Sequence, residues 1–173
     1  MSRYVEFDRR NLEVFSIELA HLLFAAASEV DVVAKQLCQV VAPAARRGNI
    51  DEYKAALLPV LPGLPTDGIV VPRYGLSFKP WDSWAAPGPG INPNWWRSYN
   101  NVKHERSDYF HEATLQHALN ALGALLILIY HLYARTVGPT GAVLPPKDTT
   151  NEMEPQSILL RLDGDYYYDH LVV

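Results

Sequence analysis

One long periodic stretch constrains the fold of this chain more than any other feature. Apolar residues recur at three- and four-residue spacing from about residue 9 to 42, which places them on one side of a single helix. Asp8 is a candidate N-cap and Pro43 ends the pattern. The stripe consists of Leu12, Phe15, Leu19, Leu23, Ala26, Val30, Ala34, Leu37 and Val41.

The opposite side of this helix is not uniformly polar, because Ile17 and Phe24 lie there beside Asp31 and Lys35. A helix that is apolar on two sides usually lies between two layers or against another subunit. We therefore expect a homodimer.

A second long helix is predicted over residues 108–136, with a stretch from Leu122 to Tyr130 that is apolar nearly all round. Such a stretch is typical of the most buried helix of a bundle. Shorter helices are expected at about 50–58 and 95–105. The predicted fold is mainly α, a helical bundle built around two long antiparallel helices, 9–42 and 108–136.

The segment between the long helices is rich in proline, with eight of the 13 prolines between residues 59 and 93. A small β-hairpin is predicted within it, around Arg73-Tyr74-Gly75. Trp81 and Trp84 indicate either a packed cover over the helices, which we favour, or a functional loop. A C-terminal hairpin is expected over 156–173, and it could join the first one in a small sheet.

Length and composition favour a single domain over residues 1–173, with a core that needs no disulfide. The net charge of −4 argues against a general nucleic-acid coat protein, and the single cysteine, Cys38, excludes an intrachain disulfide. The N-terminus lacks the order of a secretory signal, and the apolar run from Ala121 to Tyr130 is about half of the ~20 residues that span a bilayer. We expect a cytoplasmic protein without membrane contact.

The densest cluster of reactive side chains is residues 94–106, NWWRSYNNVKHER. If the helix continues from Arg97, a polar line is formed that runs on into the leucine stripe of the second long helix. A polar stripe in this register indicates a cleft or a partner, unless an N-cap at Ser107-Asp108 breaks the helix. The line consists of Arg97, Asn101, His104, Asp108 and His111.

Arginine and histidine on one helix face suffice in principle for metal-independent RNA cleavage. Histidine can move a proton near neutral pH, and the guanidinium can hold a phosphate through paired hydrogen bonds. RNA supplies its own nucleophile, the 2′-hydroxyl. No metal and no cofactor are therefore expected. Tyr99 or a tryptophan could stack on a base, and Lys103 could hold a neighbouring phosphate.

Arg97-x6-His104 at the start of a helix resembles the motif of the HEPN superfamily, and Trp96-x2-Tyr99-Asn100-x2-Lys103-His104-x-Arg106 is similar to forms in uncharacterised bacterial HEPN-like proteins. The resemblance implies a ribonuclease of toxin–antitoxin, CRISPR or phage-defence type, with Arg97 and His104 catalytic. It also implies a dimer with a composite site, and an antitoxin or other protein partner. Ser98 is smaller than the amide or acid that usually follows the arginine. Glu29 is the candidate for a polar group from the first helix, and Asn100 and Asn101 are supporting candidates.

Two other interpretations remain open. Glu18-x2-His21 and Asp108-x2-His111 place carboxylates and imidazoles on adjacent turns, as di-iron bundles do, although a fourth group is missing. Cys38 is a poor nucleophile because it lies in an apolar helix. The other open interpretation, besides the metal site, is a non-catalytic helical protein-interaction module, in which the polar stripe forms a structural hydrogen-bond network.

Overall fold

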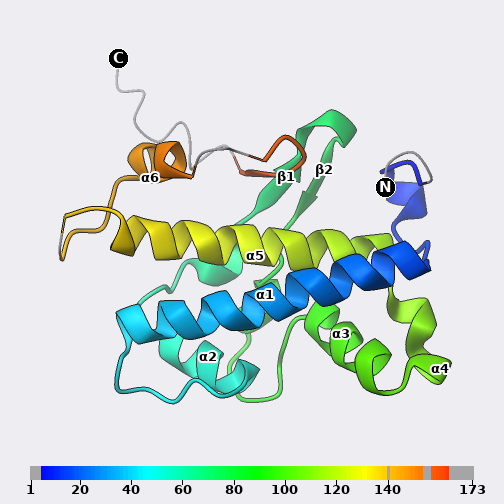
Figure 1. Cartoon of the computed structure of the whole chain (residues 1–173), viewed down its shortest axis with the longest axis horizontal. Coiled ribbons are helices and arrows are strands. Elements are labelled where there is room, and N and C mark those ends of the chain that lie inside the picture. The colour runs from blue at the N-terminus through cyan, green and yellow to red at the C-terminus, as the bar shows by residue number, and fades with distance from the viewer. Residues whose placement is uncertain (1–4, 140, 154–156, 164–173) are drawn as a thin grey trace.

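Two long α-helices form the centre of the protein, whose computed structural model describes residues 5–139, 141–153 and 157–163. These are α1 (Ile17–Val41) and α5 (Leu115–Thr136), which pack side by side (Figure 1). The expected mainly helical fold with a small β element is confirmed.

The two long helices run in the same direction. Backbone hydrogen bonds join the segment just before α1 to the first turn of α5: the amide of Leu115 donates to the carbonyl of Val14 at 2.9 Å, and that of Gln116 donates to the carbonyl of Leu12 at 2.9 Å. The antiparallel orientation expected from the sequence was therefore wrong. The reason is the connection, because residues 42–114 lead the chain back to the end at which α1 begins before α5 starts (Figure 1).

The first long helix begins later than its apolar pattern suggests. Ser16 is the N-cap of α1, and its hydroxyl accepts a hydrogen bond from the amide of Leu19 at 3.2 Å. Residues 9–11 instead form a separate 3₁₀ turn, η1 (Arg9–Asn11), so the predicted start at residue 9 was wrong. The pattern misled because Leu12 packs against the core from non-helical backbone, whereas Phe15, in the same stripe, is largely exposed.

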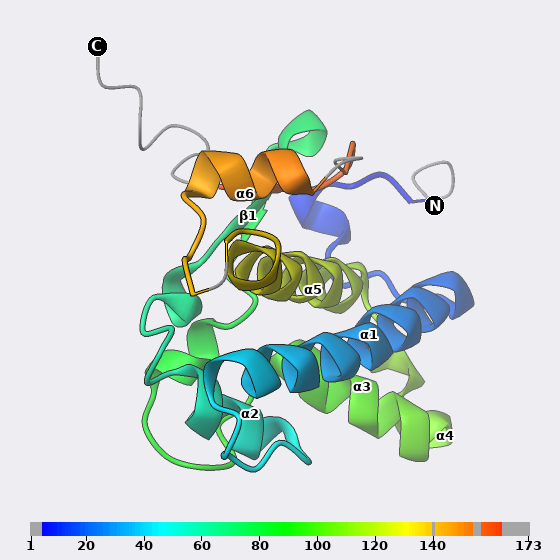
Figure 2. The same cartoon turned by 60° about the vertical axis from the view of Figure 1, so that its left-hand side comes forward.

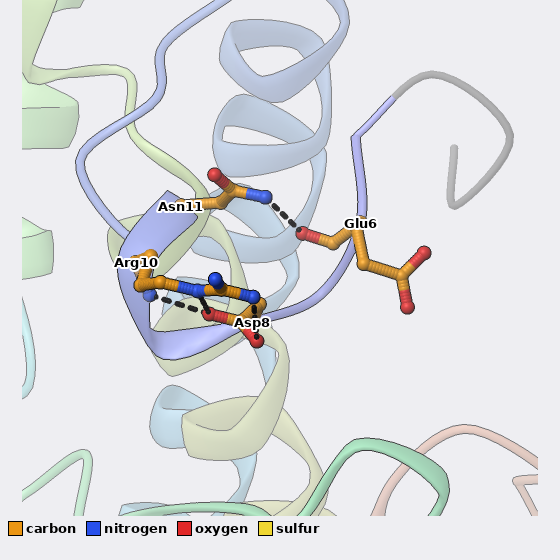
Figure 3. Close-up of polar contacts among 4 residues, drawn as sticks. All are labelled: Glu6, Asp8, Arg10 and Asn11. Carbon is orange, nitrogen blue, oxygen red and sulfur yellow. Dashed lines mark hydrogen bonds and ion pairs between the residues drawn. The ribbon is translucent and has the colours of Figure 1, made fainter.

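Asp8 does act as a cap, but of η1. Its carboxylate accepts hydrogen bonds from the Arg10 side chain and amide, both at 2.8 Å, while the Asn11 side chain donates to the carbonyl of Glu6 (Figure 3). The side-chain hydrogen bond from Arg10 is the main cause that lowers the Asp8 pKa to about 2. Since this value lies below the ordinary one, the carboxylate supports the turn above pH ~4 and loses that role as the pH falls toward 2.

The core side of α1 agrees with the predicted stripe, since Leu19, Leu23 and Val30 are fully buried. On its other side α1 packs against α2 (Ile50–Leu57) and α3 (Asn94–His104), so it lies between two layers (Figure 2). Phe24 is half-buried there, with its ring centroid 6.0 Å from that of Tyr99 on α3. Contact with α3 therefore explains why an apolar residue, Phe24, lies on this side of α1. Ile17 remains 43% exposed.

Helix α5 begins at Leu115 rather than at residue 108, because Thr114 is its N-cap and accepts from the amide of His117. Most of its residues are buried or half-buried, as predicted for the central helix. By length and composition α5 could cross a bilayer, but half of its apolar stretch is buried within the protein. At Gly123 the backbone approaches the proline-rich connector so closely that a Cβ would lie 2.6 Å from Cγ1 of Ile69.

The connector contains the predicted hairpin, formed by β1 (Ile69–Val71) and β2 (Leu76–Phe78). Gly75 enables the tight turn between them, with a φ of 60°. A third strand, β3 (Arg161–Leu162), pairs with β1, which gives the order β2-β1-β3. The sheet thus joins the connector to the C-terminal part, as expected, although the second strand of the predicted C-terminal hairpin lies outside the described residues.

The tryptophans of the connector belong to the core. Trp81 and Trp84 are buried with ring centroids 4.4 Å apart, and the indole of Trp81 donates to the carbonyl of Ala124 on α5 at 3.4 Å. The interpretation as a packed cover is confirmed. The connector also contains three short 3₁₀ turns, η2 (Leu64–Thr66), η3 (Pro72–Tyr74) and η4 (Asp82–Ala85).

Two shorter helices, α2 and α6 (Pro146–Glu152), lie before and after α5 in the sequence. In α2 the buried Lys54 ammonium donates to the carbonyls of Ala86 at 2.8 Å, Gly88 at 3.1 Å and Ile91 at 3.4 Å, which fastens the loop before α3. After α5 the chain forms α6, which packs on α5 and for which the sequence analysis predicted no helix. A proline suits the first position of a helix, where its missing N–H is not needed.

Candidate functional site

The candidate site is built on α3, which the core holds by one side. Trp95, Ser98 and Val102 are buried along that side, and the indole of Trp95 donates to the carbonyl of Pro80 at 2.8 Å. The spacing of three and four residues between them fixes the rotation of the helix about its axis. The motif residues on the other side must therefore face outward.

Arg97 and His104 both lie on this outward side and are exposed. Two helical turns separate them, about 10 Å along the axis at 1.5 Å per residue. The Arg97 guanidinium donates to the side-chain carbonyl of Asn94 at 3.1 Å. Within the described part of the chain, no carboxylate forms an ion pair with Arg97 or His104. The structure therefore brings the two predicted catalytic residues to one open face.

The polar line predicted beyond His104 was wrong. Helix α3 ends at His104, where Glu105 leaves helical geometry with φ −136° and ψ 52°. The next residues form α4 (Arg106–Tyr109) and the 3₁₀ turn η5 (Phe110–Glu112) before α5 begins. Three separate elements replace one continuous helix, so Asp108 and His111 are not in register with Arg97. The cap that starts α5 is Thr114 and not Ser107 or Asp108, because the chain must first turn to bring α5 alongside α1.

Two of the supporting residues make contact with each other beside the open face. The Lys103 ammonium donates to the Tyr99 hydroxyl at 3.2 Å and lies 5.3 Å from the centre of its ring. The Tyr99 ring also contacts Trp96, with centroids 5.5 Å apart. The Lys103 ammonium therefore lies at the hydroxyl end of Tyr99 rather than over its ring, while Phe24 and Trp96 lie beside the ring.

The two asparagines have structural partners. The side-chain amide of Asn100 donates to the carbonyl of Trp96 at 2.9 Å, and that of Asn101 donates to the Glu112 carboxylate at 3.1 Å. The second bond ties α3 to η5 and makes Glu112 a neighbour of the site. The sequence carried no signal for this residue, because the contact depends on the turn after His104.

Glu29 lies apart from the α3 face. It is exposed on α1, and at 100° per residue it points roughly 140° away from Phe24, the residue through which α1 contacts Tyr99. Within one protomer the structure does not bring Glu29 near Arg97 and His104.

The carboxylate–imidazole pairs considered as a metal site do not form a cluster in the described residues, where no group of three or more histidine, cysteine or acidic side chains could hold an ion. Cys38 is fully buried in α1, and this burial raises the pKa of its thiol to about 11. A thiol with this pKa is protonated at neutral pH and is a weak nucleophile.

Sequence reasoning missed an ion-pair geometry that joins distant segments. Nε2 of His131 on α5 lies 2.6 Å from Oδ2 of Asp67 in the connector, and both side chains are nearly buried. The pair holds the connector against α5 and lies on a different element from the motif. Since 64 residues separate the partners, no local pattern could have identified it.

Comparison with family models, curated proteins and solved structures finds no match for this chain. The interpretation as a HEPN-like protein therefore stays a prediction that rests on the motif residues.

Proposed function

We propose that the outward face of α3 binds RNA and cleaves its phosphodiester backbone without a metal ion. One observation carries this proposal: Arg97 and His104 are both exposed on the same side of one helix, and no described carboxylate neutralises either of them. A structural hydrogen-bond network would instead be closed over and fully paired.

The roles follow from the chemistry of the two groups. The Arg97 guanidinium has only a neutral amide partner in the described structure, so a phosphate can replace Asn94 at little cost and accept two charge-assisted hydrogen bonds. His104 would take the proton of the 2′-hydroxyl or supply one to the leaving oxygen. Both side chains lean toward the N-terminus of α3, and the Arg97 guanidinium extends there to Asn94, so it must leave Asn94 and turn toward His104 for the two groups to reach one phosphate.

The charge of the segment limits the kind of RNA binding to expect. Between residues 94 and 112, three basic side chains (Arg97, Lys103, Arg106) balance three acidic ones (Glu105, Asp108, Glu112), which leaves no net charge apart from histidine. Binding would then involve only one to three phosphates. Since each phosphate contact to a single strand contributes a slope of about −0.7, log K should fall with log salt at a slope between roughly −0.7 and −2.

Cleavage of mixed single-stranded RNA in EDTA tests this proposal. The wild type should cleave, and His104→Ala should lose a general acid–base contribution of roughly 100- to 10,000-fold. His21→Ala, which removes another exposed histidine from α1, is the matched control and should cleave at the wild-type rate. Equal cleavage by wild type and His104→Ala, or no cleavage by either, would refute the assignment to this face.

A non-catalytic protein-interaction module is the second candidate, and a different surface favours it. Val14, Phe15 and Ile17, at the start of α1, are 39%, 48% and 43% exposed, and Phe15 packs edge-on against Phe110 with ring centroids 5.8 Å apart. Exposed apolar groups gathered in this way are typical of contact surfaces. If RNA is not cleaved, the protein should capture a partner protein through this surface. The Phe15→Asp variant should lose the partner, and the similarly exposed control Val60→Asp should keep it.

A further inference from the structure

The exposed apolar side chains at the start of α1 form a patch with a neighbour from η5. The start of α1 lies at the same end of the molecule as α4 in both views (Figures 1 and 2). Val14, Phe15 and Ile17 are all exposed there, and the Phe15 ring packs edge-on against the half-buried ring of Phe110. We call these four residues the Phe15 patch. Since the fold leaves them open, a partner that covers them would supply the burial that they lack.

Carboxylates accompany the Phe15 patch on both segments that form it. Residues 13–18 and 105–112 contain five carboxylates and one guanidinium, a formal charge of −4 that equals the charge of the whole chain. Four of these carboxylates are exposed, and none of the four forms an ion pair within the described residues. They are Glu13, Glu18, Glu105 and Asp108.

The other two charged groups of these segments already have neighbours. The Arg106 guanidinium lies 5.0 Å from the centre of the Phe110 ring, and the Glu112 carboxylate accepts a hydrogen bond from the side-chain amide of Asn101. One guanidinium cannot balance five carboxylates. The Phe15 patch therefore combines exposed apolar side chains with an excess of negative charge.

We propose that the Phe15 patch binds a basic amphipathic helix of a partner protein. Two turns of such a helix present three or four apolar side chains on one side, as many as the patch contains, with cationic side chains on the flanks. The apolar side would cover Phe15 and Ile17, and the cations would meet the unpaired carboxylates. This inference names the partner for the second candidate function, on which it rests, and it does not depend on RNA cleavage.

The charge of the Phe15 patch disfavours other occupants. RNA and anionic lipid surfaces are themselves negative, so the exposed carboxylates repel them. A second copy of this chain, bound through the same patch, would bring its own carboxylates against those of the first, and like charges placed opposite each other weaken an interface. A cationic partner gains from the same groups instead.

Fluorescence anisotropy of labelled model peptides mixed with the full chain tests the proposal. A helical peptide of about 18 residues, with leucines on one side and lysines on the other, should bind, and more weakly as the salt concentration rises. A peptide with glutamate in place of lysine should not bind, nor should a scrambled leucine–lysine peptide that has no apolar side.

Variants of the apolar side chains test the contact with the Phe15 patch. Phe15→Asp should lower the affinity for the leucine–lysine peptide at least about 10-fold, the size of effect expected for a central aromatic contact. Val60→Asp adds the same negative charge at a similarly exposed site and should not lower the affinity. Circular dichroism checks that Phe15→Asp is folded, and Ile17→Asp is the second variant if it is not.

Charge reversal tests the carboxylates without changing the apolar side chains. Glu13→Lys combined with Glu18→Lys should weaken peptide binding about 5- to 50-fold at low salt, because two attractions become repulsions. Glu29→Lys combined with Asp82→Lys changes the net charge equally at exposed sites elsewhere and should bind nearly as the wild type does. An equal loss in both double variants would assign binding to overall charge and overturn the proposal.

Three other results would also overturn the proposal. They are no binding of the leucine–lysine peptide, binding that Phe15→Asp leaves intact, and a wild-type dimer in sedimentation that Phe15→Asp dissociates, which would assign the patch to a second copy. If a partner protein is captured through Phe15 but the leucine–lysine peptide does not bind, the second candidate function stands and this inference fails. If Phe15→Asp affects neither, both fail.

Discussion

Replacing Gly123 with alanine should destabilise this protein, although the same change stabilises most helices. In an exposed helix interior, alanine is more favourable than glycine by about 1 kcal/mol. In α5, however, the new Cβ would lie 2.6 Å from Cγ1 of Ile69 and 3.1 Å from Cγ of Pro80. Neither neighbour can move easily, because Ile69 is a fully buried strand residue and Pro80 is a rigid ring.

The magnitude follows from these distances. Overpacking a core usually costs about 1–3 kcal/mol, and the upper half of this range applies because the overlap involves the inner atom of a β-branched side chain. After subtraction of the helix-propensity gain, the free energy of unfolding should fall by about 1–2 kcal/mol. For a domain of this size, the melting temperature should fall by roughly 2–8 °C.

Thermal and urea denaturation of matched variants measure this effect. Gly63→Ala is the control, because a Cβ there meets no heavy atom within 4 Å and the φ of −77° suits alanine. This control should stabilise by about 0.4–1 kcal/mol. Ile69→Ala removes the clashing atom, so Gly123→Ala should cost at least ~1 kcal/mol less in that background.

The refuting result is a gain in stability for Gly123→Ala comparable with that of Gly63→Ala. Such a gain would mean that β1 does not pack against the middle of α5. The covering role of the connector would then have to be abandoned.

Two further predictions concern buried polar groups. Burial raises the pKa of the Cys38 thiol to about 11, so native protein should react with a thiol reagent at pH 8 only through unfolding, whereas denatured protein should react at once. Rapid labelling of the native protein would contradict the burial of this thiol. Lys54→Met should release the loop over residues 86–91 and lower the free energy of unfolding by about 2–3 kcal/mol, because three carbonyls lose a charged donor. Amide hydrogen exchange in this loop should become faster in Lys54→Met and stay unchanged in Lys79→Met, which replaces an exposed lysine.

The candidate site was predictable only as far as one helix extends. The spacing of Arg97 and His104 placed them on one face of a short helix, and α3 has that face open to solvent. The continuation to Asp108 and His111 failed, because helical periodicity assumes an unbroken helix and Glu105 interrupts it. Nothing local to the segment indicates that α5 must restart at Thr114, where the backbone pairs with the strand-like residues before α1.

Apolar spacing and short-range caps predicted α2, α3 and the main length of α1 and α5, together with the buried side of the long helices, because these signals act within a few residues; they did not predict α6. Leu19, Leu23 and Val30 line the core as their spacing predicts. The shared direction of α1 and α5 and the contact between Tyr99 and Phe24 appear only in the tertiary structure. These outcomes depend on contacts between residues far apart in the chain, and periodicity within one element carries no information about the element that packs against it.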